Sequence, residues 1–244
     1  MTMKIALIGY GNMGRDVENA LKDTPHKVVS VSYRTLNEGL DKAGIAKSDV
    51  AIDFTAPSIV LTNIENVAKL GVNMVIGTTG WYEQLPKVKQ IVNKNKIGIV
   101  YGQNFSIGAN IFFQIVDFAS NLVNRFGGYD VFGLEVHHAG KKDSPSGTAK
   151  KLADVIMKQV PTKKKLVNDP LQRQITNEEL HFTSIRGGRN PGFHEITFDS
   201  PADQIKLSHQ AHGRRGFALG AIMAAEFIKG KKGLHSFDEL FKIS

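Results

Sequence analysis

The sequence lacks cysteine entirely and has a single tryptophan among its 244 residues. The absence of cysteine excludes disulfides, thiolate metal sites and thioester chemistry. A chain without disulfides suits a reducing compartment, so we expect a cytoplasmic protein.

Long apolar runs are also missing. The first apolar stretch, residues 5–8, ends at Gly9 and is far shorter than the roughly 20 residues that span a membrane. It is also shorter than the apolar core of a signal peptide, about 7 to 15 residues. We therefore expect a protein that is neither exported nor inserted into a membrane.

Positive charge is in excess, because 31 Lys and Arg residues face 23 Asp and Glu residues, for a formal net charge of +8. Nucleic acid would suit such a surface, but a positive field also concentrates anionic small molecules at a cleft. The densest basic run, residues 163–165, has no interleaved aromatics and is predicted to be a solvated loop. We find no helix-turn-helix or basic helix, and expect no nucleic-acid partner.

Apolar strand-like runs alternate with amphipathic helical stretches as far as residue 101. Strands are predicted at 4–8, 27–32, 50–54, 73–76 and 97–101, with helices at 11–22, 58–70 and 82–93. Repeated βα units favour a parallel sheet that helices cover on both faces.

After Asn104 the pattern changes. Helices are predicted at 109–123 and 148–157, and strands at 129–136, 180–185, 194–198 and 204–209. A crossover followed by hairpins indicates a second, α+β domain with an open mixed sheet. A helix at 216–229 and a short helix opened by the capping-box pattern Ser236-Phe-Asp-Glu239 are expected to return to the first domain.

A glycine-rich motif, Gly9-Tyr-Gly-Asn-Met-Gly14, stands between the first predicted strand and the first helix. Gly9 permits a tight turn, Gly11 lets the backbone approach a pyrophosphate, and Gly14 allows close helix-strand packing. Glycine patterns also occur in plain turns, but this position favours a dinucleotide site. Its candidate residues are Gly9, Tyr10, Gly11, Asn12, Met13 and Gly14.

The position that selects the cofactor ribose follows the second predicted strand. Ser32-Tyr-Arg34 offers a hydroxyl, an aromatic ring and a guanidinium, but no carboxylate. An acid there would favour NADH, whereas Arg34 can pair with the 2′-phosphate of NADPH. We expect NADPH or NADH, and Arg34 is interpreted either as a phosphate ligand or as a solvated arginine.

Two further loops follow predicted strands at the sheet edge where ligands bind in folds of this kind. They are Gly77-Thr-Thr-Gly80, close to the expected nicotinamide, and Gly102-Gln-Asn-Phe105, at the change of domain. Each can also be an ordinary turn.

A segment rich in cations and small polar residues runs from Glu135 to Ala149, with the sequence EVHHAGKKDSPSGTA. Side chains alternate along a strand, so His137 and His138 should point in opposite directions. Lys141 can supply positive charge or a proton. This composition is typical of an anion-binding acid/base site.

The same segment leads into a helix. Ser144 or Ser146 can cap that helix, and the amides of its first turn can hold a carboxylate. A metal site would need further ligands at suitable spacing, which the sequence does not offer, so we expect none.

The segment resembles the HHxxKxDxPSGTA signature of the dihydrodipicolinate (4-hydroxy-tetrahydrodipicolinate) reductase family of the bacterial diaminopimelate and lysine pathway. Ser144 stands where alanine is usual in that family. The resemblance extends over almost the whole chain. It also includes Gly9 to Gly14, Asp49-Val-Ala-Ile-Asp-Phe54, Gly77-Thr-Thr-Gly-Trp81, Asn104-Phe-Ser-Ile-Gly108, Ser184-Ile-Arg-Gly-Gly188 and Ser208-His-Gln-Ala-His212.

The resemblance implies a reductase that transfers hydride from NADPH or NADH to a cyclic dicarboxylate in lysine biosynthesis. It implies that His137 and Lys141 are the acid/base pair and that His138, Gly147 and Thr148 bind the substrate. The residues implied to line the nicotinamide are Gly77, Thr78, Thr79, Gly102, Gln103, Asn104 and Phe105.

The predicted fold class is α/β, with a Rossmann-type doubly wound parallel sheet and a second α+β domain on an open mixed sheet. We predict a dinucleotide-binding domain at 1–105, a substrate-binding and oligomerisation domain at 106–213, and C-terminal helices at 214–244. An open sheet needs its second face or its edges covered, so we expect oligomerisation through the second domain. The expected assembly is a homotetramer, with a dimer as the alternative.

Two other functions remain open at this stage. Another Rossmann reductase is conceivable, although phosphorylating semialdehyde dehydrogenases require a nucleophilic cysteine. A dinucleotide-sensing regulator without turnover is a different class, and the acid/base cluster argues against it.

Overall fold

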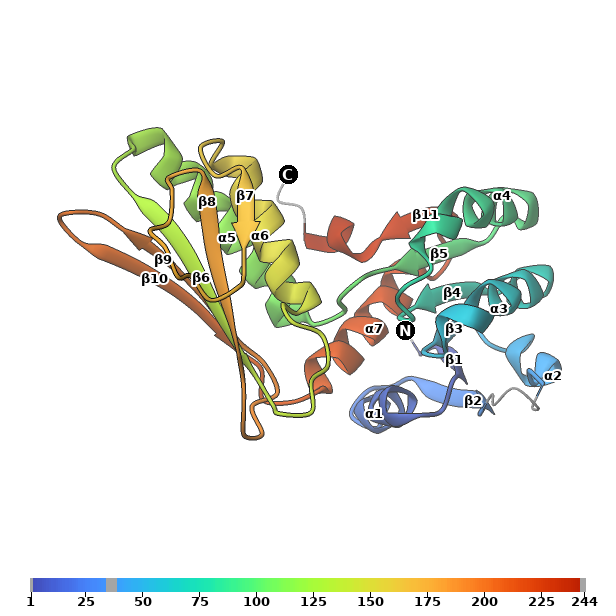
Figure 1. Ribbon diagram of the computed structural model, residues 1–244. Helices are drawn as coiled ribbons and strands as arrows, with labels where there is room; N and C mark the ends of the chain where they lie inside the picture. Colours follow the sequence, from blue (N-terminus) through green and yellow to red (C-terminus); the bar gives the residue numbers. More distant parts are fainter. Residues whose placement is uncertain (1, 34–38, 242–244) are drawn as a thin grey trace. The chain divides into compact units, whose positions relative to one another are not determined.

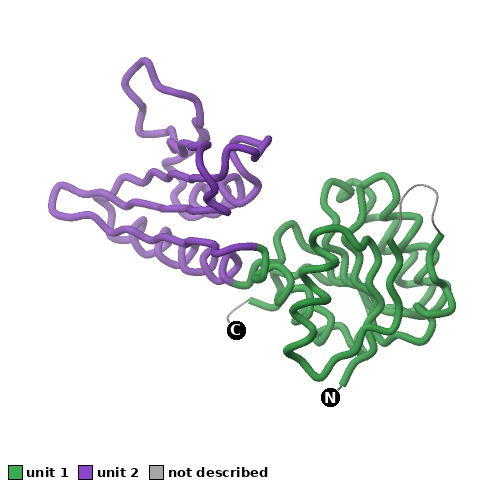
Figure 2. The backbone as a smooth tube through the Cα atoms, turned by 90° about the horizontal axis from the view of Figure 1, so that it is seen from below, with its two compact units in different colours: residues 1–107, 214–244 green, residues 108–213 purple. Residues whose placement is uncertain are grey.

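The structure is a computed structural model that describes residues 2–33 and 39–241. It divides into two compact units, drawn in different colours in Figure 2. Unit 1 is formed by residues 1–107 and 214–244, and unit 2 by residues 108–213. Unit 1 is therefore discontinuous in sequence.

Unit 1 contains a six-stranded sheet in the order β11-β5-β4-β3-β1-β2, in which every pairing is parallel (Figure 1). Its elements in chain order are β1 (Lys4–Ile8), α1 (Asn12–Leu21), β2 (Lys27–Ser32), α2 (Lys42–Ile45), β3 (Val50–Asp53), α3 (Pro57–Lys69), β4 (Asn73–Ile76), η1 (Tyr82–Gln84), α4 (Leu85–Asn95), β5 (Gly98–Tyr101), α7 (Arg215–Ile228), β11 (Gly233–Ser236) and η2 (Phe237–Phe241). The predicted doubly wound parallel sheet is confirmed.

Helices cover both faces of this sheet because the strands are apolar on both sides. In β1, Ile5 and Leu7 pack with α1 and α7, whereas Ala6 and Ile8 pack in the cluster that holds α3 and α4. All four side chains are almost completely buried. This two-sided burial is what a continuous apolar strand in a parallel sheet requires.

Two features of unit 1 differ from the sequence prediction. Strand β11 and the four-residue helix α2 were not predicted, because both are too short to show a period. The capping-box segment does open a short helix, the 3₁₀ helix η2. Its Glu239 still accepts a hydrogen bond from the Ser236 backbone N–H at 3.1 Å.

Unit 2 contains a five-stranded mixed sheet in the order β10-β9-β6-β8-β7. Strand β6 is antiparallel to β9 and parallel to β8. The elements are α5 (Ile107–Phe126), β6 (Asp130–His137), α6 (Gly147–Gln159), β7 (Lys165–Val167), β8 (Glu179–Arg186), β9 (Phe193–Asp199) and β10 (Gln204–Gln210). The predicted open mixed sheet is confirmed.

Helices α5 and α6 pack on one face of this sheet, where Val131, Phe182 and Phe198 are buried with Phe113 and Leu152. Strand β6 alternates between buried and more exposed residues along most of its length, as expected for a sheet with one covered face.

The prediction of a solvated loop at 163–165 is wrong for Lys163, whereas the side chains of Lys164 and Lys165 are exposed as predicted. Lys163 is only 6% exposed. Its Nζ lies 2.5 Å from Asp130 Oδ1 and donates to the Glu179 carbonyl oxygen at 3.0 Å. Lys165 begins strand β7. Charge-run reasoning failed here because the tertiary partners of Lys163 are distant in sequence.

Among residues 2–33 and 39–241, none of the helices has the length and apolar character needed to cross a membrane.

Candidate functional site

The glycine motif forms the turn between β1 and α1. Gly9 has a positive φ of 85°, and a Cβ there would lie 2.4 Å from the Phe54 carbonyl oxygen. A Cβ on Gly14 would lie 2.5 Å from the Gly9 carbonyl oxygen, whereas one on Gly11 would meet nothing within 4 Å. Gly9 and Gly14 are therefore required by the turn and the packing, and Gly11 leaves open space beside the start of α1.

The loop after β4 is tied to the end of β3 by a buried carboxylate. Asp53 Oδ1 accepts hydrogen bonds from the Thr55 backbone N–H at 2.9 Å and from Thr78 Oγ1 at 3.0 Å, and Oδ2 accepts from Asn63 Nδ2 at 2.7 Å. Burial raises the pKa of Asp53, although these hydrogen bonds oppose the shift. The two loops are thereby held together.

A cavity in unit 1 lies where these loops meet the N-terminus of α1. It is lined by Gly11, Asn12, Met13, Phe54, Thr55, Pro57, Gly77, Thr78 and Thr79. Free backbone N–H groups at a helix start suit an anion, and the small residues leave room for it. The cavity has the character of a dinucleotide site.

Other predicted cofactor residues are placed differently. Gly102 to Phe105 follow β5 but are outside that cavity lining. Phe105 is 2% exposed and packs against Phe237 in the core, with 4.6 Å between ring centroids. Tyr10 hydrogen-bonds to Glu18. Arg34 lies outside the described residues.

In unit 2, His137 and His138 lie at the end of β6. His137 is 6% exposed, whereas His138 is exposed. The prediction that they point in opposite directions is confirmed. The His138 backbone N–H donates to the Asn190 carbonyl oxygen at 2.7 Å, which fixes the chain at this point.

The loop after β6 leads into α6. Lys141 Nζ lies 2.7 Å from Asp143 Oδ1, an ion pair at the protein surface. Of the two predicted caps, the N-cap of α6 is Ser146, whose Oγ accepts from the Ala149 backbone N–H at 3.1 Å. Gly147, which begins the helix, is exposed, and Thr148 is half-buried.

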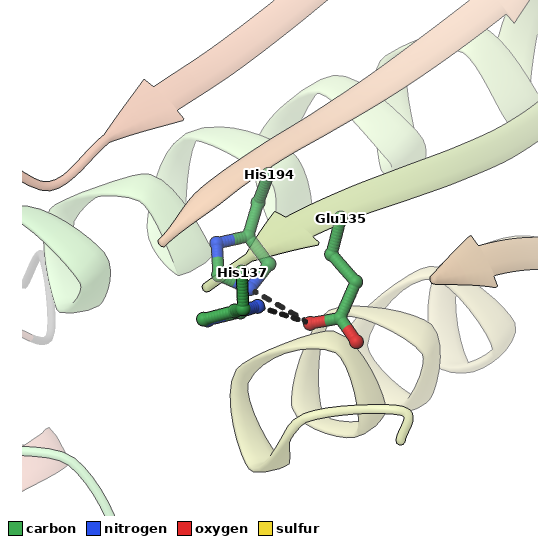
Figure 3. Close-up of side chains that lie close together, drawn as sticks. All are labelled: Glu135, His137 and His194. Atoms are coloured by element: carbon green, nitrogen blue, oxygen red, sulfur yellow. Dashed lines mark ion pairs between the residues drawn. The ribbon is translucent and has the colours of Figure 1, made fainter. Parts of the chain in front are cut away.

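His137 borders a buried carboxylate that the sequence analysis did not single out (Figure 3). Glu135 Oε2 lies 3.2 Å from His137 Nδ1 and 3.5 Å from His194 Nε2. Burial alone would raise the pKa of Glu135, but contacts with His137, His194, Ser146 and Arg186 hold it well below its ordinary value. Burial is also the main cause that lowers the pKa of His194.

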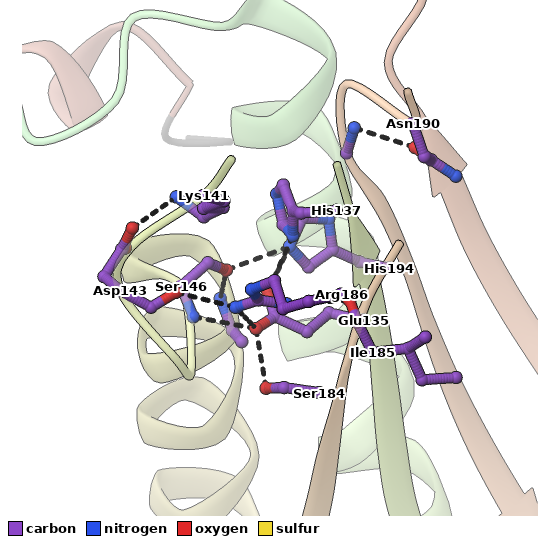
Figure 4. Close-up of polar contacts among 12 residues, drawn as sticks. Glu135, His137, Lys141, Asp143, Ser146, Ser184, Ile185, Arg186, Asn190 and His194 are labelled. Carbon is purple, nitrogen blue, oxygen red and sulfur yellow. Dashed lines mark hydrogen bonds and ion pairs between the residues drawn. The ribbon is translucent and has the colours of Figure 1, made fainter. Parts of the chain in front are cut away.

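The other oxygen of the Glu135 carboxylate, Oε1, accepts three hydrogen bonds (Figure 4). Glu135 Oε1 accepts from the Ser146 backbone N–H at 2.8 Å, from Ser184 Oγ at 2.7 Å and from Arg186 Nη2 at 2.8 Å. Arg186 Nη2 also donates to the Asp143 carbonyl oxygen at 2.7 Å. The Glu135–Arg186 pair therefore holds the end of the Lys141 loop that is next to α6, at Asp143 and Ser146.

Within residues 2–33 and 39–241, Glu135, His137 and His194 also form a group whose possible metal-ligand atoms lie within 4.8 Å of one another. The sequence analysis missed it because the ligands come from two strands. A metal ion would share the carboxylate with Arg186 and would lie near Lys141, whose charge already acts on His194. These positive charges disfavour a cation, and the site fits acid/base chemistry better.

One of the missed residues was within reach of sequence reasoning. Glu135 stands two residues before His137 on the same strand, and a period of two places both side chains on one face. The resemblance included Arg186 within residues 184–188 but gave it no role, and His194 lies outside the quoted motifs. Strand pairing brings both residues to this carboxylate.

Two family models match the chain. The one described as dihydrodipicolinate reductase, N-terminus, covers residues 3–105, and the one described as dihydrodipicolinate reductase, C-terminus, covers residues 108–241.

Full-length relatives are also similar. A 4-hydroxy-tetrahydrodipicolinate reductase from Christiangramia forsetii is 37% identical over 98% of this chain and 97% of its own length. One from Methanococcus aeolicus is 34% identical over 93% of this chain and 77% of its own. A solved dipicolinate-bound dihydrodipicolinate reductase from Paenisporosarcina sp. TG-14 has the same fold, with a TM-score of 0.81 and 24% identity, over 98% of this chain and 100% of that one.

Proposed function

The chain belongs to the dihydrodipicolinate reductase family, and from this premise we propose that it reduces 4-hydroxy-tetrahydrodipicolinate to tetrahydrodipicolinate in the diaminopimelate route to lysine. The observation that carries the proposal is the position of His137 and Lys141 beside the start of α6, on a scaffold matched by both family models. We place the reaction in the cytoplasm, which the cysteine-free composition suits.

The fold and family imply a nicotinamide cofactor. The residues present fit it, because the cavity at the start of α1 combines backbone N–H groups with the open space at Gly11. We propose that Gly9 to Gly14 hold the pyrophosphate and that Gly77 to Thr79, with Gly102 to Phe105, line the nicotinamide. When bound, the reduced cofactor supplies the hydride. We propose NADPH or NADH, with Arg34 as the candidate ligand of a 2′-phosphate.

The substrate is proposed to bind unit 2 as a dianion. We propose that Gly147 and Thr148 bind one carboxylate, because they form the first turn of α6 and the N-terminus of a helix favours an anion. His138 is exposed on the same segment, and Lys141 adds positive charge. Substrate would compete with Asp143 for the Lys141 ammonium.

In the proposed mechanism, the 4-hydroxyl group of the substrate leaves as water, and hydride arrival at an unsaturated carbon of the resulting ring leaves negative charge on the substrate. Lys141 stabilises that charge electrostatically. A proton from His137 Nε2, the ring nitrogen on the far side from Glu135, neutralises it. Glu135 keeps its negative charge throughout, because its pKa is held low by its partners.

The direct test is the loss of 340 nm absorbance with NADPH and then with NADH. Substrate is generated from pyruvate and aspartate semialdehyde by the preceding synthase. Oxidation only in the complete system would support the reductase and rank the two cofactors. Cofactor binding without oxidation would overturn the proposal.

Replacing Gly11 with alanine should weaken dinucleotide binding without unfolding the protein. The new methyl group meets no protein atom within 4 Å, so it can obstruct only a ligand. Loss of one charge-assisted hydrogen bond to the pyrophosphate, about 1.5 to 3 kcal/mol, raises Kd by about 10- to 150-fold. Calorimetric titration with NADPH measures the change.

Gly187→Ala is the matched control, since its Cβ is equally free of contacts but lies in unit 2. An unchanged Kd in Gly11→Ala would show that the pyrophosphate does not approach this turn.

We further propose that unit 2 mediates a homotetramer. The sheet face opposite α5 and α6 carries exposed apolar side chains, including Phe132 at 39% and Ile185 at 50% exposure. An uncovered apolar sheet face of this kind is typical of an interface.

Light scattering coupled to gel filtration should therefore give four times the protomer mass for the wild type. Ile185→Lys should lower that mass, because it introduces a charge into the proposed interface. Ile175→Lys is the control, since Ile175 is 38% exposed but lies between strands β7 and β8. A monomeric wild type, or an Ile185→Lys tetramer, would contradict this interface.

A further inference from the structure

Four polar residues on four neighbouring strands of the unit 2 sheet lie side by side. His209 on β10 pairs with His194 on β9, His194 pairs with Glu135 on β6, and Glu135 pairs with Ser184 on β8. Glu135 lies on the buried face of β6, the same face as Val131, and has no exposed surface. A carboxylate is thus placed at the covered end of a hydrophobic core.

Burying a carboxylate is costly unless donors satisfy it. Three donors reach Oε1, from Ser146, Ser184 and Arg186. They come from the start of α6 and from β8, so the carboxylate cannot rotate without breaking contacts to two elements. The direction of Oε2 is thereby fixed.

Oε2 lies 3.2 Å from His137 Nδ1. Both atoms are buried, and neither makes a hydrogen bond of good geometry within the described part of the chain, so their close approach is an ion-pair contact. His194 approaches the same oxygen from β9 at 3.5 Å, with its ring 5.2 Å from that of His137 in an edge-on arrangement. The His137 ring is therefore held between a carboxylate and a second imidazole.

The other ring nitrogen of His137 is on the side of Gly192. A Cβ on Gly192 would lie 3.1 Å from His137 Nε2. Glycine at this position keeps a side chain away from the nitrogen that our mechanism uses for proton transfer. Glu135 and Gly192 thus lie beside different nitrogens of the same ring.

We propose that Glu135 is the positioning residue of the active site, whose buried carboxylate keeps one proton on His137 Nδ1 in both charge states of the ring. Nε2 is then the nitrogen that takes up the second proton from solvent and, from the cationic ring, donates it to the substrate. This inference rests on the proposed function, in which His137 is the proton donor. Orientation of an imidazole by a hydrogen bond at its other nitrogen sets which tautomer is present.

Glu135→Gln tests the proposal, because it keeps the shape of the side chain and removes its charge. We expect kcat to fall by about 10²- to 10⁴-fold, with the KM values for substrate and cofactor within about threefold of wild type. The cost falls on kcat because the substrate ligands and the unit 1 cavity are untouched.

A second readout does not depend on turnover. In ¹⁵N-histidine-labelled protein at a pH where the ring is neutral, the His137 signals should report the Nδ1–H tautomer in the wild type. They should report the Nε2–H tautomer, or a mixture, in Glu135→Gln. If the wild type proved to have no reductase activity, the proposed function would fail while this measurement still decided the role of Glu135.

Glu195→Gln is the matched control. Glu195 is next to His194 on β9 but lies on the alternate face, so kcat and the His137 signals should not change. Because Glu135→Gln leaves Arg186 without its charge partner, Glu135→Gln/Arg186→Met provides a variant in which both charges are removed together. It should show the same loss of kcat. A kcat near wild type in either variant, or an unchanged tautomer in both, would overturn the proposal.

Discussion

His137→Gln is expected to lower kcat by about 10²- to 10⁴-fold, the range that a positioned general acid contributes. Glutamine fills much of the same space but cannot donate the proton that the reduced substrate needs. Steady-state assays at saturating cofactor measure the loss. Cofactor binding should not change, because the proposed dinucleotide site lies in unit 1 and His137 in unit 2.

The matched control is His181→Gln. His181 lies on β8 of the same sheet, on the alternate face to Phe182 and Ser184, and should tolerate the change with little loss of kcat. Equal losses in the two variants would indicate a general perturbation of the sheet. A His137→Gln enzyme with normal kcat would remove His137 from the mechanism.

Arg186→Met is expected to destabilise the protein by about 3 to 5 kcal/mol, because it leaves the buried Glu135 carboxylate without its guanidinium partner. A loss of this size is a large part of the about 5 to 15 kcal/mol that holds a typical domain folded. Urea unfolding at pH 7 measures it. Arg189→Met, at an exposed arginine nearby, should stay within about 0.5 kcal/mol of wild type.

The pH dependence provides a second check on the same pair. The pKa of folded Glu135 lies well below its ordinary value of 4.5. The charged Glu135 carboxylate therefore stabilises the folded protein fully above about pH 4.5, and this contribution to the free energy of unfolding is lost as the pH falls toward the folded pKa. Arg186→Met should show a shallower loss of stability below pH 4.5. The role of the pair would be contradicted if Arg186→Met lost less than about 1 kcal/mol of unfolding free energy at pH 7 and its stability fell below pH 4.5 as steeply as that of the wild type.

The features that the sequence predicted correctly are those that a local hydrophobic period encodes. Residues 5–8, apolar on both faces, indicated a parallel sheet with two helical layers, and the structure has one. The alternation in β6 correctly separated His137 from His138. Short elements without a full period, such as β11 and β7, were missed for the same reason.

Buried charge was the least predictable property. Lys163 was expected to be solvated because it stands in a basic run, yet strand β8 and Asp130 provide its partners. Glu135 was seen only as the end of a strand. In both cases the side chain is stabilised by residues distant in the chain.

The sequence by itself determined the two-part fold, the glycine turn and the family, because each depends on residues that are close together in the chain. The tertiary structure decided how the acid/base site is supported. Arg186 and His194 are 51 and 59 residues from Glu135 in sequence, and strand pairing alone brings them to the same carboxylate. Register between strands is a long-range property, set by how whole elements pack, and no local pattern encodes it.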